Sequence, residues 1–214
     1  MSAKMIVFRA RGQAEHDLPS GVPVASASLQ SSKNWRILNS DGAQADVVYV
    51  QHPRTSGALV TYAGFHPWIE DEKVQSALTF VTALGVSRVT LRRESQKDTA
   101  FKVSLPALFA KIAGDLQVSR RESNLYEVVR EGPGARPRPV PPLTWADPSW
   151  AGLEEGVRKG QFTTHRLVVE NDDNLGIGGT LASKFLKHKI SLGGDLKKVS
   201  STRYVFELEF PAKS

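Results

Sequence analysis

Two stretches of the chain align with each other at a constant separation of 76 residues. The identical pairs include Leu91 with Leu167, Glu94 with Glu170, and Phe109 with Phe185. Eight identities fall within the 52 positions from 71 to 122, whereas ordinary residue frequencies give roughly three. A fixed offset of this kind predicts an internal duplication, in which one small unit is built twice.

The predicted elements follow the same order in both stretches. In the first, the expected helix, strand, helix and two strands span residues 70–84, 86–94, 104–114, 116–121 and 125–130. In the second, the same elements span residues 148–159, 162–170, 180–189, 190–198 and 202–210. The periods of 3.6 and 2 in the apolar residues separate helices from strands. The sequence therefore predicts an α+β protein with two related αβαββ units of ferredoxin-like order, at residues 67–131 and 143–214.

Residues 1–66 are expected to form a β-rich N-terminal segment. Its short β-branched and aromatic runs lie at residues 5–9, 35–38, 47–50 and 58–62. Turn-forming residues separate these runs, which is typical of strands in a small sheet.

A proline-rich connector at residues 132–142 holds five of the twelve prolines. Such a segment is stiff and extended. We expect it to be a spacer between the two units, with a proline-rich ligand motif as the alternative.

The composition removes several kinds of site. The chain of 214 residues contains no cysteine, which excludes disulfides, cysteine-ligated metal centres and thiol nucleophiles and favours a reducing compartment. No apolar run approaches the ~18 residues of a transmembrane helix, and the N-terminal apolar run is too short for a signal peptide. We therefore expect a soluble cytoplasmic protein.

A basic cluster in the second unit is the most informative local feature. Its members are Lys184, Lys187, His188, Lys189, Lys197, Lys198 and Arg203, opposed only by Asp195. Leu181 and Phe185 are one helical turn apart and should face inward, which leaves the lysines on the outer face. With a net charge of +6 and a pI near 9.6, such a face is suited to a phosphate backbone. The alternative is a solvated surface that keeps the protein in solution.

The arginines of the first unit are expected to be neutralised locally. They are Arg88, Arg92, Arg93, Arg120 and Arg121. Glu94, Asp98, Asp115 and Glu122 lie close to them in the sequence, and opposite charges on neighbouring strands stabilise a sheet.

A glycine-rich run precedes the second helix of the second unit. Gly176, Gly178, Gly179 and Thr180 form a possible phosphate-binding loop, since backbone amides at a helix start attract anions. The run lacks the Gly-Lys-Ser/Thr of a P-loop. A glycine turn into a helix capped by Thr180 explains it as well.

No catalytic constellation stands out in the sequence. The five histidines show no metal-ligand spacing, and no nucleophile motif is present. We expect no cofactor and no metal, and the chain is more typical of a binding protein than of an enzyme.

The function predicted from the sequence is a non-enzymatic nucleic-acid-binding module, or one associated with nucleic acid in a larger assembly. The first alternative is a structural or interaction subunit (an adaptor, scaffold or inhibitor) that pairs or self-associates through sheet edges such as residues 202–210. Membrane-surface association through the same basic face is the second alternative, and an enzyme without a known motif is the third.

Overall fold

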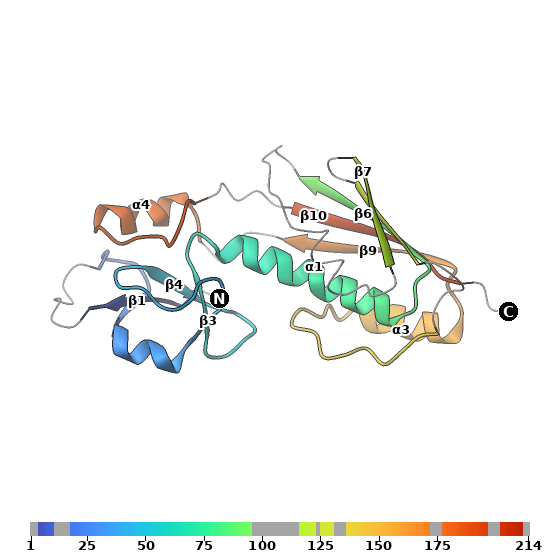
Figure 1. Ribbon diagram of the computed structural model, residues 1–214, viewed down its shortest axis with the longest axis horizontal. Helices are drawn as coiled ribbons and strands as arrows, with labels where there is room; N and C mark the ends of the chain where they lie inside the picture. Colours follow the sequence, from blue (N-terminus) through green and yellow to red (C-terminus); the bar gives the residue numbers. More distant parts are fainter. Residues whose placement is uncertain are drawn as a thin grey trace. The chain divides into compact units, whose positions relative to one another are not determined.

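The chain forms two compact units in the computed structural model (Figure 1). Unit 1 comprises Met1–Ile69 and Asp173–Val199, and unit 2 comprises Glu70–Asp172 and Ser200–Ser214. The structure describes residues 4–10, 18–95, 116–122, 125–130, 136–171, 177–196 and 202–211. Each unit has its own β-sheet, so the α+β class is confirmed.

Unit 1 contains a mixed five-stranded sheet in the order β2-β1-β4-β5-β3. The strands are β1 (Met5–Arg9), β2 (Val24–Ser28), β3 (Arg36–Ile37), β4 (Val48–Gln51) and β5 (Ala58–Thr61). The 3-10 helix η1 (Leu29–Asn34) lies on one side of the sheet and α4 (Gly179–Lys187) on the other (Figure 1). Because both faces are covered, consecutive residues Val48, Tyr49 and Val50 are all fully buried.

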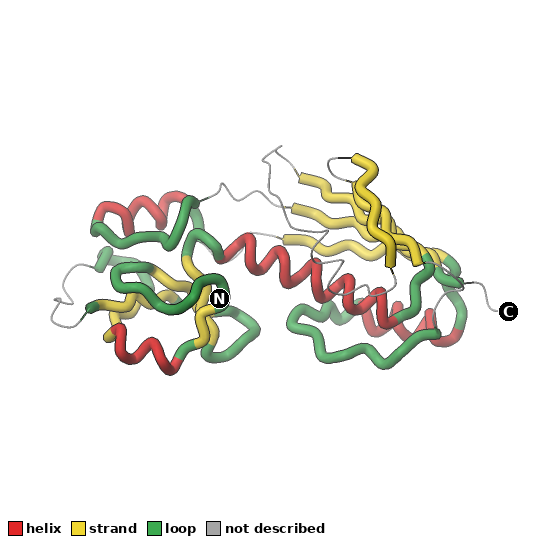
Figure 2. Tube along the Cα trace, viewed as in Figure 1, coloured by secondary structure: helices red, strands yellow, loops and turns green. Residues whose placement is uncertain are grey.

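Unit 2 contains an antiparallel five-stranded sheet in the order β7-β8-β6-β10-β9. The strands are β6 (Arg88–Ser95), β7 (Leu116–Glu122), β8 (Leu125–Arg130), β9 (Thr164–Asn171) and β10 (Thr202–Glu209). Helices α1 (Phe65–Ala83) and α3 (Trp150–Lys159) cover one face, as Figure 2 shows in red against yellow strands.

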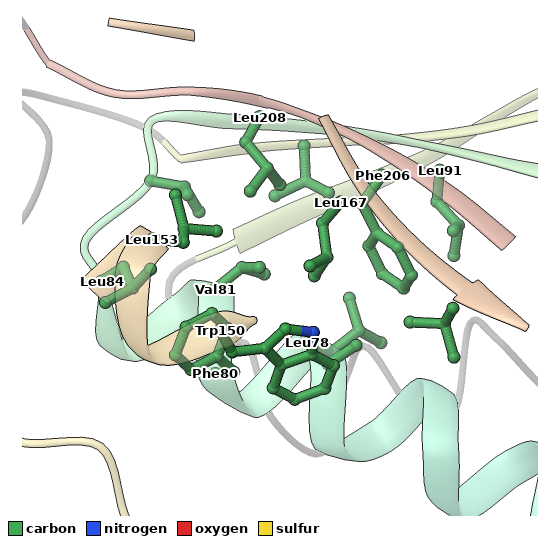
Figure 3. Close-up of a cluster of buried hydrophobic side chains, with 14 of the residues drawn as sticks. Leu78, Phe80, Val81, Leu84, Leu91, Trp150, Leu153, Leu167, Phe206 and Leu208 are labelled. Atoms are coloured by element: carbon green, nitrogen blue, oxygen red, sulfur yellow. The ribbon is translucent and has the colours of Figure 1, made fainter. Parts of the chain in front are cut away.

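The main hydrophobic core of unit 2 lies between this face and the two helices (Figure 3). Strand register places Leu91, Phe206 and Leu167 in one row across β6, β10 and β9. From the helices, the rings of Phe80 and Trp150 stack with centroids 4.9 Å apart. Each such side chain stabilises the fold by roughly 1.5–3 kcal/mol when it is fully buried.

Most of the strands predicted from the sequence are confirmed, and β1 and β8 have the predicted bounds. Helix α1, however, begins at Phe65 and not at residue 70. Phe65 and Ile69 are buried, so tertiary packing extends the helix beyond its predicted start at residue 70. Strand β2 was not predicted, because its sequence Val-Ala-Ser-Ala-Ser lacks a β-branched or aromatic pattern.

Two other predicted elements of the repeats have different outcomes. The strand expected at 190–198 is wrong over its described part, where Ser191 makes only an isolated parallel bridge with Val47. The helix expected at 104–114 lies outside the described residues.

The connector does not join two compact units. Residues on both sides of it belong to unit 2, and Val140 and Leu143 pack against the unit 2 core. The interpretation as a spacer between units is therefore wrong. The predicted unit at 143–214 is likewise divided, since α4 belongs to unit 1 while α3, β9 and β10 belong to unit 2.

Repeated ferredoxin-like units are not evident in the described parts of the chain. The 76-residue offset has one counterpart in the sheet of unit 2, where β6 and β9 flank β10 on its two sides. Arg203 lies opposite Glu94 on one side and opposite Glu170, the equivalent residue, on the other. The duplication itself stays a prediction.

Candidate functional site

Helix α4 carries the described lysines of the predicted basic cluster and is held firmly on unit 1. Its inner residues Ala182 and Phe185 are buried, and the ring of Phe185 meets that of Tyr62 edge-on at a centroid distance of 5.6 Å. The Tyr62 hydroxyl donates a hydrogen bond of 2.9 Å to the carbonyl of Gly178. The orientation of the helix, and so of its outer face, is fixed by these contacts.

The start of α4 is anchored by a second buried side chain. His66 is buried and donates from Nε2 to the carbonyl oxygen of Ile177 at 2.7 Å. This hydrogen bond requires the proton on Nε2, so the ring serves to position the backbone and is not free to act as a base at that atom.

The outer face of α4 presents hydroxyls and lysines along one stripe. Thr180, Ser183, Lys184 and Lys187 recur at helical spacing and are all exposed. Residues 177–194 contain no acidic residue. Within the described ranges no carboxylate lies within ion-pair distance of Lys184, Lys187 or Lys189. We call Thr180, Ser183, Lys184, Lys187 and Lys189 the α4 surface.

Lys189 stands in an unusual backbone position. Its φ is 58°, in the left-handed region, where helices commonly place a glycine just after their C-cap. The amide of Lys189 donates to the carbonyl of Leu186 and that of Ile190 to the carbonyl of Phe185, so both carbonyls in the last turn of α4 are paired. A lysine in this position costs about 1–2 kcal/mol relative to a right-handed conformation. His188, the C-cap, is half-buried.

The glycines at the start of α4 are not required by the packing. Gly178 is the N-cap with an extended φ of −133°, and it makes no side-chain capping bond. A Cβ atom added to Gly178 or Gly179 would meet nothing within 4 Å. The prediction of a Thr180 cap is therefore wrong, since Thr180 is the second helical residue. Gly176 lies outside the described residues.

Arg203, the last member of the predicted cluster, is in a different environment. It belongs to unit 2, where its guanidinium lies 3.9 Å from a carboxylate oxygen of Glu94 and 3.8 Å from one of Glu170. It is therefore neutralised by neighbouring strands. Lys197 and Lys198 lie outside the described residues.

Strand β10 is not a free edge. It lies between β6 and β9, which makes the suggested self-association through residues 202–210 wrong. Among the described strands the edges of this sheet are β7 and β9. At the end of β9, the ammonium of Lys73 donates to the carbonyl of Glu170 at 3.0 Å. A lysine over an edge strand discourages pairing with another chain.

Sequence reasoning missed two features of the structure. Leu186 on α4 is 57 % exposed, the one large hydrophobic residue with such exposure among the described residues. The available signal was that Leu186 directly follows the inward Phe185 in a nine-residue helix, which turns Leu186 away from the core. The other feature is a buried polar group in unit 2, which the prediction of a helix from residue 70 did not indicate.

The buried polar group is centred on Glu70. Its carboxylate accepts a hydrogen bond of 2.6 Å from the Tyr204 hydroxyl and lies 3.6 Å from the guanidinium of Arg93. Burial, the charge of Glu70 and this hydrogen bond raise the pKa of Tyr204 above its usual range. Burial and the charge of Glu70 raise the pKa of Asp71 to about 6. Glu70 and Tyr204 are buried, so the group is a structural network of the core.

No cluster of three or more metal-ligating side chains occurs in the described part of the chain. Within the same ranges, no helix combines the length and apolar content needed to span a bilayer. Comparisons of the chain with protein-family models, with curated proteins and with solved structures find no match.

Proposed function

We propose that the chain binds nucleic acid, as a non-enzymatic module, through the α4 surface. The observation that carries this proposal is the absence of any carboxylate partner for Lys184, Lys187 and Lys189 within the described ranges. Lysine ammonium groups and serine and threonine hydroxyls are common ligands of the phosphate backbone. All five residues of the surface are exposed on an anchored helix.

The start of α4 supports the same role. Gly178 and Gly179 have open space where a side chain would be, so a phosphate group could approach the first amides of the helix closely. These contacts are not specific for sequence, and affinity should depend mainly on charge. Gly178→Ala and Gly179→Ala should fold normally and bind more weakly.

The salt dependence of binding follows from counterion release. Three lysine–phosphate contacts give a slope of about −2.7 in log affinity against log salt, so affinity falls roughly 40-fold between 50 and 200 mM salt. Fluorescence anisotropy with a labelled duplex and a labelled single strand of equal length measures this slope.

The test variant is Lys184→Glu/Lys187→Glu, and its matched control is Lys4→Glu/Lys33→Glu. Lys4 and Lys33 are also exposed on unit 1, and both variants change the net charge equally. We expect the α4 variant to lose affinity at least about tenfold, and the control less than threefold. Equal losses in both variants would show that net charge and not the α4 surface governs binding.

A protein-docking role is the second candidate, because Leu186 is exposed beside three lysines. Basic surfaces with an exposed apolar residue also suit acidic protein partners. Association that survives high salt and is lost in Leu186→Ser would favour this candidate. Sedimentation with anionic vesicles, lost in neutral ones, would favour the membrane alternative.

We infer that the ferredoxin-like repeat arose by duplication, because residues 76 apart on β6 and β9 face the same residues of β10. An experimental structure of residues 96–115 tests this inference. A helix at 104–114 that packs as α4 does would support it, and a different arrangement would contradict it.

A further inference from the structure

The described part of the proline-rich connector has a conformation that its own covalent chemistry restricts. Every residue from 136 to 142 is a proline or directly precedes one. Proline fixes its own φ near −65°, and the residue before a proline is held in the extended region. No cis peptide bond occurs among the described residues. These restrictions favour a polyproline II helix, which has three residues per turn.

One of the three faces of this helix is attached to unit 2. Val140 and Leu143 are three residues apart, so they share a face, and both pack against the unit 2 core. The backbone of Arg138 is fixed as well, because its amide donates to the carbonyl of Ala83 at 2.7 Å. Its carbonyl accepts a bond of 3.0 Å from the Arg158 guanidinium. Figure 2 shows this loop running beside α1 and α3.

The other two faces point away from the core. Arg136, Pro139 and Pro142 form one face, and Arg138 and Pro141 form the other. All five of these residues are exposed. Residues 136–146 contain no acidic residue, and within the described part of the chain neither Arg136 nor Arg138 forms an ion pair.

We propose that this connector is a docking site for a domain that recognises polyproline II. The exposed residues have the pattern Arg-x-x-Pro-x-x-Pro, in which Pro139 and Pro142 are one turn apart. Prolines at this spacing fill adjacent aromatic-lined grooves of SH3-like domains. Arg136, one turn earlier, reaches a carboxylate beside those grooves.

Attachment to unit 2 suits the segment for this role. A polyproline II ligand that is already ordered loses less conformational entropy when it binds. The face that contacts unit 2 is not needed by the partner, because Arg136, Pro139 and Pro142 all lie on another face. This docking site is separate from the α4 surface and does not depend on the nucleic-acid proposal.

The experiment uses the full chain and a panel of purified SH3 domains that have aromatic grooves beside an acidic pocket. Isothermal titration with each domain should show saturable one-to-one binding to at least one member. With that domain, Pro139→Ala/Pro142→Ala and Arg136→Glu should each weaken binding at least about tenfold.

The matched control is Pro137→Ala, which removes an exposed proline that is not part of the Arg136, Pro139 and Pro142 pattern. It should change affinity less than about threefold, since Pro137 lies on a different face of the polyproline II helix from that pattern. Unchanged thermal melting of all variants shows that the core under the connector remains folded. The proposal is overturned if no domain of the panel binds saturably, or if Pro137→Ala weakens binding as much as Pro139→Ala/Pro142→Ala.

Discussion

The α4 surface of unit 1 and the polar face of the unit 2 sheet both carry several cations, but they differ in how these cations are compensated. On α4 no acidic residue accompanies the lysines. On β6, β9 and β10 the exposed side chains of the face opposite the core include four arginines and four glutamates. These are Arg88, Arg92, Arg166 and Arg203, with Glu94, Glu170, Glu207 and Glu209.

Strand register explains the compensation in unit 2. Arg203 lies opposite Glu94 and Glu170, Glu207 opposite Arg166, and Glu209 opposite Arg88. The Arg88–Glu209 pair has a separation of 3.5 Å. An abundance of basic residues therefore does not identify a binding surface, because pairing across a sheet decides which of them are available to a ligand.

The largest expected effect comes from reversing the charge of Arg203, which lies on the polar face of the unit 2 sheet. Arg203→Glu places three glutamates in a row and removes two favourable cross-strand pairs, which should lower the free energy of unfolding by about 2 kcal/mol. Lys184→Glu on α4 should change it by less than about 0.5 kcal/mol. Urea denaturation measures both values. Equal losses of stability in the two variants would show that Arg203 is no more strongly paired with carboxylates than Lys184 is.

The second prediction concerns a variant in which the polar face of the unit 2 sheet becomes more basic. Glu94→Gln/Glu170→Gln leaves Arg203 without its two carboxylates and raises the net charge by two. Affinity for a DNA duplex at low salt should rise about tenfold, equivalent to ~1.4 kcal/mol. Anisotropy titrations against the wild type check this, with Glu154→Gln/Glu155→Gln on α3 as a control that changes the net charge equally and releases Arg158 and Lys159 from their ion pairs. If both double variants gain the same affinity, the gain follows from released cations in general and not from the row around Arg203.

The third prediction separates charge from backbone strain at Lys189. Lys189→Gly removes the cost of the left-handed conformation, about 1–2 kcal/mol. Glycine also raises the conformational entropy of the unfolded chain, which lowers the free energy of unfolding by about 0.4–1 kcal/mol. The net free energy of unfolding should therefore rise by about 0.7 kcal/mol. Lys189→Ala keeps the backbone cost and should leave stability nearly unchanged. Both variants remove one phosphate contact and should lower the salt slope by about 0.9. Thermal melting and salt titrations together test this. A loss of stability in Lys189→Gly would show that the lysine side chain has a structural role.

The sequence predicted well those elements whose signal is local. In strand β10 the inward residues Tyr204, Phe206 and Leu208 alternate with Arg203, Val205 and Glu207, although Val205 is also buried. Strand β8 is bounded by turn residues, and both strands were found within one residue. The basic character of α4 and its inward Phe185 also followed from helical spacing.

Features that depend on distant partners were missed. The position of β10 between β6 and β9 pairs residues more than 100 positions apart, such as Arg203 with Glu94. No local pattern encodes that choice, so the neutralisation of Arg203 was not foreseen. The attachment of the connector was missed for the same reason, because Val140 and Leu143 pack against core residues that lie elsewhere in the sequence.

The last prediction concerns Asp71, whose charge changes near neutral pH. Burial and the neighbouring Glu70 raise its pKa to about 6 from an ordinary value of 3.8, while Glu70 itself faces Arg93 and Tyr204. Between these two values the folded state holds a proton that the unfolded state has released. This contribution to stability is complete below pH 4 and is lost as pH rises through 6.

Asp71→Asn should therefore raise the free energy of unfolding at pH 7 by less than about 1 kcal/mol, after allowance for partial solvent screening. It should also remove this part of the pH dependence. Urea denaturation at pH 5 and 7 measures both effects. Because Asp71 belongs to unit 2, its replacement should leave nucleic-acid affinity unchanged at either pH. An affinity that changes through pH 6 in the wild type and not in Asp71→Asn would show that unit 2 takes part in binding, so that the α4 surface would no longer account for it alone.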